Sequence, residues 1–142
     1  MKTIFVKEHE QTRKWYLIDA ADKPLGRVAA KAAAILRGKN KVTFATNQNM
    51  GDFIVIINAD KVAVTGNKET GKVYHQYSGF VGGMKNHTFA KMIEKHPENP
   101  LIFAISGMLP HNRLGRVMMD NCKIYAGADH PHKAQNPQPL DV

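Results

Sequence analysis

The chain has 142 residues, of which 43% are hydrophobic. This length and composition fit one folded domain with a buried core and exclude a chain that is disordered as a whole. Twenty lysines and arginines oppose twelve acidic residues, giving a formal net charge of +8, which indicates an anionic partner: nucleic acid, or alternatively a membrane surface. A single cysteine excludes an intrachain disulfide, and the apolar runs are far shorter than the roughly 20 residues of a membrane span.

The first part of the chain predicts an arm, a strand and a helix. Residues 1–14 are polar and without periodicity, which favours an extended arm, and they contain no apolar stretch typical of a signal peptide. Residues 15–20 are rich in aromatic and branched side chains, which predicts a strand. After a turn at 22–24, apolar residues repeat at helical spacing over 25–36, and Gly38 suits a left-handed helix end. Residues 1–42 carry +6 of the total charge.

The middle of the chain predicts three strands. The continuous branched and aromatic run at 53–57 is typical of a strand that is buried on both faces. Residues 62–65 and 73–77 are expected to form a hairpin around a turn at 66–72. Three glycines over 78–85 indicate a flexible loop.

The last part of the chain predicts helices, a strand and a tail. Thr88 is a suitable N-cap for a helix that contains Phe89, and apolar residues over 101–109 predict a second helix that Pro110 ends. A short helix over 114–119 and a strand over 122–125 follow, and we expect the tail over 127–142 to become ordered only on a partner. Strands that alternate with helices predict an α/β domain with a largely parallel sheet.

Enzyme and metal sites have weak support. Residues 66–72 match the first part of a phosphate-binding loop, G-x-x-x-x-G-K, but Val73 follows where Ser or Thr is required, and a strand is predicted where a helix is required. A phosphate-handling enzyme built on this loop remains the alternative. His130 and His132 with Cys122 supply too few ligands with suitable spacing for a zinc site. We expect no catalytic residue, no metal and no cofactor.

Three groups of basic and aromatic residues predict an RNA interface. Cations follow the first helix at 37–41, two arginines flank Gly115, and the segment 72–77 combines lysine with rings that can stack on unpaired bases. A membrane surface is disfavoured because these residues do not share a helix with a broad apolar face. The predicted RNA-binding residues are Arg27, Arg37, Lys39, Lys41, Lys68, Lys72, Tyr74, His75, Tyr77, Lys85, Arg113, Arg116, Lys123, His130, His132 and Lys133.

Several motifs resemble the bacterial ribosomal protein L13 family of the large subunit. They include ISGMLP at 105–110, LGR at 114–116, KIYAG at 123–127, LRGK at 36–39 and VTGNK at 64–68, and the likeness covers essentially the whole chain as one domain, 1–142. The resemblance implies a three-layer α/β/α fold around a mainly parallel four-stranded sheet, with basic loops and an extended C-terminal tail. Ser106 stands where relatives usually have a basic or branched residue, and Asp120 and Asn121 stand where basic residues are common, so RNA contact near Ser106 and Asp120 has weaker support.

The resemblance also implies a function. It implies a structural constituent of the large (50S) subunit that binds large-subunit ribosomal RNA (23S rRNA) and supports early assembly. The implied partners are this RNA and neighbouring large-subunit ribosomal proteins. It implies a cytoplasmic location in the ribosome, without membrane contact, small-molecule substrate, cofactor or catalysis.

Overall fold

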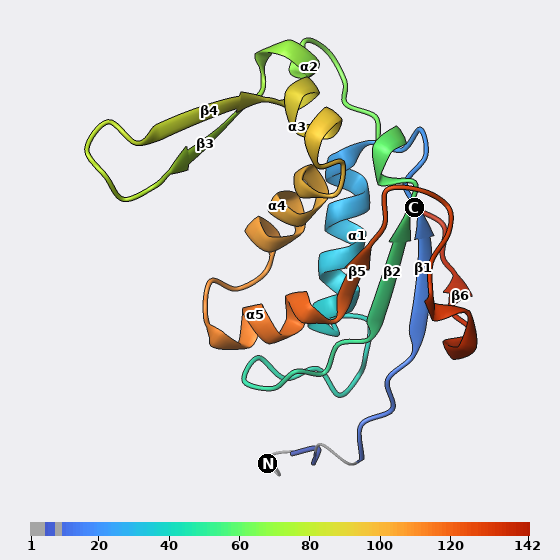
Figure 1. The fold of residues 1–142 in the computed structure, drawn as a ribbon. Coiled ribbons are helices and arrows are strands. Elements are labelled where there is room, and N and C mark those ends of the chain that lie inside the picture. The colour runs from blue at the N-terminus through green and yellow to red at the C-terminus, as the bar shows by residue number, and fades with distance from the viewer. Residues whose placement is uncertain (1–4, 8–9) are drawn as a thin grey trace.

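The computed structural model describes residues 5–7 and 10–142, so part of the predicted arm over 1–14 lies outside the described residues (Figure 1). The strands are β1 (Trp15–Asp19), β2 (Phe53–Ile57), β3 (Val73–Tyr77), β4 (Met84–Thr88), β5 (Cys122–Ile124) and β6 (Gln138–Pro139). The α-helices are α1 (Leu25–Arg37), α2 (Lys68–Gly71), α3 (Phe89–Lys95), α4 (Asn99–Met108) and α5 (Arg113–Asp120), and the 3-10 helices are η2 (Ala59–Lys61) and η3 (His132–Gln135).

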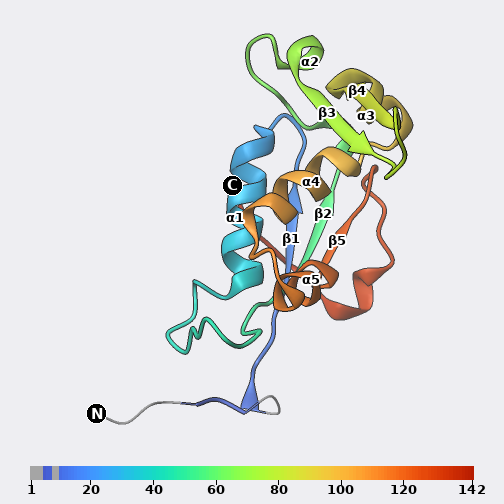
Figure 2. The same cartoon turned by 90° about the vertical axis from the view of Figure 1, so that its left-hand side faces the viewer.

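Four of the strands form one parallel sheet in the order β5-β2-β1-β6. The register pairs Trp15 with Phe53, Ile54 with Cys122, and Tyr16 with Gln138. Helix α1 packs against β2 and α4 on one face of the sheet, and Figure 2 shows α4 and α5 in front of the strands with α1 beside them. The predicted α/β fold with a parallel four-stranded sheet is therefore confirmed.

The core lies between the sheet and α1. Alternate strand residues such as Ile18, Ile54 and Ile56 face this helix, and each is fully buried. The apolar face of α1 is rich in alanine, which lets α4 pack closely against it. Burial of each isoleucine stabilises the fold by roughly 1.5–3 kcal/mol.

The C-terminal segment forms the layer on the other face of the sheet. The ring of His132 in η3 lies 5.2 Å from the ring of Trp15, which itself stacks on Phe53 at 4.6 Å. The Leu140 N–H donates to the Leu17 carbonyl oxygen at 2.8 Å as β6 joins the edge of β1. In this structure residues 127–142 pack against the chain's own sheet. That they become ordered only on an external partner stays a prediction.

The predicted hairpin has a different second strand. Residues 62–65 form only an isolated bridge, in which the Leu25 N–H donates to the Ala63 carbonyl oxygen at 2.9 Å beside the start of α1. The partner of β3 is β4, which begins inside the segment that was expected to be a flexible loop, and the two strands are antiparallel. The predicted turn at 66–72 contains the short helix α2. Within the residues that the structure covers, no helix has the length and hydrophobicity to cross a membrane.

Candidate nucleic-acid interface

Two of the three predicted basic groups come together at the end of the molecule where the parallel strands begin. The loop from α1 to β2 runs below α5 in Figure 1, and one cavity is lined by Arg13, by residues 47–49 of this loop and by Leu114 of α5. We call this surface the basic end. Its cations are Arg13, Lys14, Arg37, Lys39, Lys41, Arg113 and Arg116.

Backbone contacts hold the loop of the basic end against α1. Gly38 has φ +79°, and its N–H donates to the Ile35 carbonyl oxygen at 2.9 Å, while the Lys39 N–H donates to Ala34 at 2.9 Å. Gly51 approaches the helix so closely that an added Cβ would lie 1.7 Å from the Leu36 carbonyl oxygen. These contacts hold the backbone at both ends of the loop against α1.

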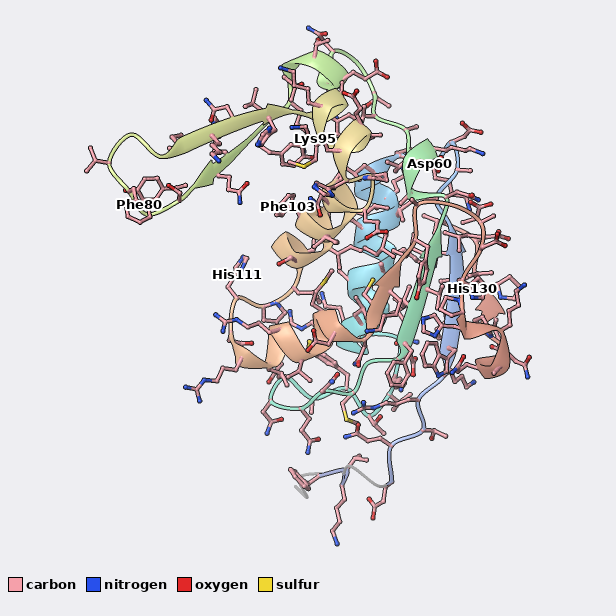
Figure 3. All side chains as sticks on the ribbon, in the orientation of Figure 1. Asp60, Phe80, Lys95, Phe103, His111 and His130 are labelled. Atoms are coloured by element: carbon pink, nitrogen blue, oxygen red, sulfur yellow. The ribbon has the colours of Figure 1, made fainter. Side chains whose placement is uncertain are left out.

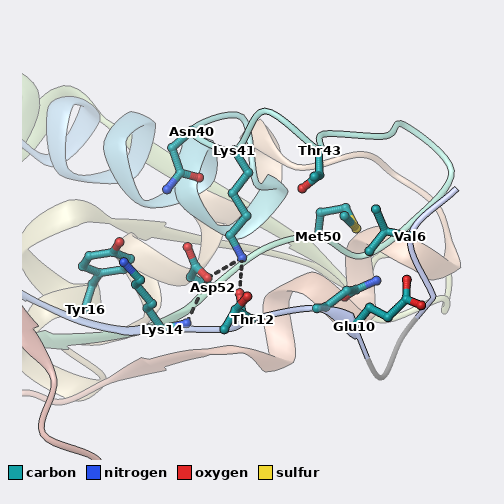
Figure 4. Close-up of a pocket in the computed structure, with 11 residues that line it drawn as sticks. Val6, Glu10, Thr12, Lys14, Tyr16, Asn40, Lys41, Thr43, Met50 and Asp52 are labelled. Carbon is teal, nitrogen blue, oxygen red and sulfur yellow. Dashed lines mark hydrogen bonds and ion pairs between the residues drawn. The ribbon is translucent and has the colours of Figure 1, made fainter. Parts of the chain in front are cut away.

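Lys41 has partners inside the protein. Its Nζ lies 2.6 Å from Oδ1 of Asp52 and 2.8 Å from the Thr12 carbonyl oxygen, which it contacts as a donor. Asp52 is only 1% exposed, and its Oδ1 also accepts the Lys14 N–H at 3.0 Å (Figure 4). These contacts lie beside a cavity of about 420 Å³ and join the loop to the arm. Lys41, which the sequence predicts to bind phosphate, thus holds the basic end together.

Other cations of the basic end point to solvent. Lys39, Arg113 and Arg116 are exposed, and no carboxylate among the described residues lies within ion-pair distance of them. The Asn112 side chain accepts the Gly115 N–H at 2.8 Å, which fixes the start of α5. Three cations from two separate segments are therefore held on one end of a rigid body, an arrangement that suits a polyanion.

Two arginines of the basic end rest on aromatic rings. The Arg37 guanidinium lies 5.8 Å from the ring centre of Phe44, and that of Arg13 lies 5.9 Å from the ring centre of Phe53. Arg13 also donates to the Asn49 carbonyl oxygen at 3.4 Å. The predicted RNA-binding residues do not include Arg13 and Lys14, although two adjacent cations immediately before a strand were a usable signal.

The third predicted group lies at the opposite end of the molecule. Lys68 and Lys72 line a cavity of about 300 Å³ together with Gly26 of α1, and the neighbouring Arg27 is exposed. Lys72 is followed by β3 and not by a helix, so this segment lacks the geometry of a phosphate-binding loop. The structure does not bring these cations to the basic end.

The rings of this third group differ in availability. Tyr74 is half-buried with its ring 5.7 Å from that of Phe103, and burial raises the pKa of Tyr74. His75 shares a 2.7 Å hydrogen bond with Asn86, so Nδ1 of its ring has a partner within the hairpin. Tyr77 and Lys85 are exposed. Of the three predicted rings, only Tyr77 is both exposed and without such a contact in the described part of the chain.

Of the predicted RNA-binding residues near the C-terminus, the lysines are exposed and the histidines are half-buried. Lys123 and Lys133 are exposed. His132 packs on the sheet, and its Nε2 lies 2.7 Å from the hydroxyl oxygen of Tyr125. The half-buried His130 lies with its ring centre 6.4 Å from that of His132. The structure gives His132 a role in holding the C-terminal segment.

Comparison with known proteins places the chain in a family. The sequence profile of the family described as ribosomal protein L13 matches residues 13–131. Large ribosomal subunit protein uL13 of Treponema denticola is 62% identical over 142 residues, which is the full length of both chains. The proteins of the same name from Akkermansia muciniphila and Symbiobacterium thermophilum are 56% identical over all of both chains and 55% identical over 99% of each. The chain therefore belongs to the ribosomal protein L13 family.

Proposed function

We propose that the chain is a structural component of the large ribosomal subunit in the cytoplasm, binds large-subunit ribosomal RNA through its basic end, and supports early subunit assembly. Family membership supports the ribosomal role, since this family is a structural and not an enzymatic class. The observation that carries the RNA contact is the exposed set Lys39, Arg113 and Arg116, gathered from two segments onto one end.

The physical basis is the neutralisation of phosphates. Each cation that contacts a phosphate releases a condensed counterion, so binding weakens with salt in proportion to the number of contacts. The contacts of Gly38 and Lys39 with α1 and the cap of α5 hold the backbone of the three cations, so little backbone freedom remains to be lost on binding. Arg27, Lys68, Lys72, Lys123 and Lys133 are further candidates for phosphate contacts. Neighbouring ribosomal proteins are the other expected partners.

A charge-matched pair of triple variants tests this proposal. Replacing Lys39, Arg113 and Arg116 with alanine should lower the slope of log affinity against log salt by roughly 2–3 units for large-subunit RNA, because about 0.7–0.9 unit is lost per phosphate contact. The control replaces Lys31, Lys91 and Lys95, which are exposed on α1 and α3, and removes the same charge. Equal slopes for the two variants would refute a localised interface, and an unchanged slope in both would refute phosphate binding by these residues.

A further inference from the structure

The hairpin of β3 and β4 extends away from the body (Figure 1). Its far end carries Tyr77, Phe80, Val81 and Met84, which we call the apolar end. Phe80 is 77% exposed and Val81 is fully exposed, and Figure 3 shows Phe80 at the far end of the ribbon. A two-stranded hairpin is marginally stable by itself in water, and exposed apolar clusters commonly mark interaction sites. This end of the hairpin therefore lacks a partner among the residues that the structure describes.

The two faces of the hairpin differ in chemistry. Tyr74 packs toward Phe103 of α4, so the face that it shares with Gln76 and Lys85 turns toward the body. Tyr77 and Met84 are directly paired across the strands and lie on the opposite face, which turns away from α4.

The outward face can be buried at low polar cost. His75 and Asn86 are also paired there, and the 2.7 Å bond between their side chains gives Nδ1 of the ring and Oδ1 of the amide a partner. Burial of a polar group is costly mainly when it loses its hydrogen bonds. A partner could therefore cover this face without leaving these two atoms unpaired.

The chemistry of the apolar end fits a protein better than a nucleic acid. Residues 78–83 carry no charge, and Lys85 lies on the opposite face. Nucleic-acid interfaces are strongly positive, whereas the cores of protein interfaces are depleted of charge and enriched in aromatic residues and methionine. Val81 and Met84 offer no ring for stacking on a base.

The charges near the hairpin indicate the charge that a partner's surface should carry. Between Glu69 and Glu94 the chain has no acidic residue, and Lys85, next to Met84, is the lysine nearest the apolar end. Complementary potentials favour association, so an acidic rim suits this segment. We propose that the apolar end docks into an apolar, acid-rimmed pocket of a neighbouring protein in the same particle, with Phe80 and Val81 as anchors. This inference rests on the proposed function, because the ribosomal particle brings the two proteins together.

Site-specific photocrosslinking tests the proposal. A benzoylphenylalanine replaces Phe80 in the full chain, large subunits containing it are purified, and adducts are analysed with and without ribonuclease. We expect an adduct of the chain with one protein that survives ribonuclease. The control probe replaces Val42, a fully exposed apolar residue in the loop of the basic end, and should give an adduct with RNA. An RNA adduct at Phe80, or none, would overturn the inference, whereas a missing RNA adduct at Val42 would count against the proposed RNA interface.

A second measurement uses the crosslinked protein as a purified partner. The double variant Phe80→Ser and Val81→Ser should weaken its affinity for the chain about 30-fold, as expected for a buried aromatic anchor. Both side chains are exposed, so the fold should be retained, and the salt slope for RNA should not change. Gln76→Ser, on the face that turns toward the body, is the matched control. Unchanged affinity in the double variant, or equal weakening by Gln76→Ser, would overturn the docking surface.

Discussion

Replacing Lys41 with alanine distinguishes a cation that supports the basic end from one that binds RNA. In the native protein the Lys41 ammonium lies 2.6 Å from Asp52, whose carboxylate is 1% exposed. Without Lys41, Oδ1 of Asp52 keeps the Lys14 N–H at 3.0 Å, and Oδ2 has no hydrogen-bond partner among the described residues. Removal of one member of a buried ion pair costs about 3–5 kcal/mol. Because Lys41 itself is 21% exposed, water can partly replace it, and we expect a loss of about 2–3 kcal/mol.

Urea and thermal unfolding of the free protein measure this loss, which corresponds to a fall in Tm on the order of 10 °C. Lys39→Ala is the matched control, because Lys39 lies in the same loop but is exposed. It should change stability by less than about 0.5 kcal/mol and lower the salt slope of RNA binding by roughly one unit. If Lys41→Ala instead left unfolding unchanged and lowered the salt slope, Lys41 would be a phosphate ligand and the assignment of a supporting role would be refuted.

Three further predictions concern the fold around the site. Gly51→Ala should destabilise the protein by more than about 2 kcal/mol in urea unfolding, because the added Cβ would overlap the end of α1. In the control Gly26→Ala the added Cβ meets no atom within 4 Å, so this change should be neutral or stabilise the protein by up to about 1 kcal/mol. Equal effects of the two changes would refute the close approach of Gly51 to α1. Asn112→Ala removes the cap of α5 and should cost about 1 kcal/mol in the same assay, with no loss if the cap is unimportant. Burial raises the pKa of Cys122 to about 12, so its thiol should resist labelling by an aromatic disulfide at pH 8 until the protein is unfolded, and rapid labelling of the native protein would contradict the burial. Because the thiol ionises at a lower pH in the unfolded chain, the stability of the protein should also fall as the pH rises from about 9 toward 12.

The sequence predicts β1, α1 and β2 well because their burial requires apolar side chains, at helical spacing in α1 and as a continuous run in β2. It fails at the second strand of the hairpin for a physical reason. Residues 62–65 contain alternating apolar side chains because Val62 and Val64 pack against the core, and not because a strand lies beside them. The true partner, Met84–Thr88, is mostly exposed and therefore carries no apolar alternation. Its pairing depends on the turn geometry at 78–83.

The candidate site shows a similar limit. Lys39 and Lys41 are two residues apart in one loop and have the same charge, so sequence alone treats them alike. Only the fold brings Asp52 and the Thr12 carbonyl oxygen to one of them. The C-terminal segment is also hard to predict, because it joins the sheet through backbone hydrogen bonds and a few rings such as His132, and these leave little trace in hydrophobicity.

The pairing of β6 with β1 has a consequence for biosynthesis. Gln138 pairs with Tyr16, so the two strands are separated by 122 positions along the chain. At 5–20 residues per second, roughly 6–24 s pass between the emergence of the first strand and that of its edge partner. During this interval the backbone of β1 on that side is an open edge that can pair with another nascent chain. The sheet can therefore be completed only after the end of the chain has been synthesised. Loss of the last few residues would leave the edge of β1 permanently unpaired.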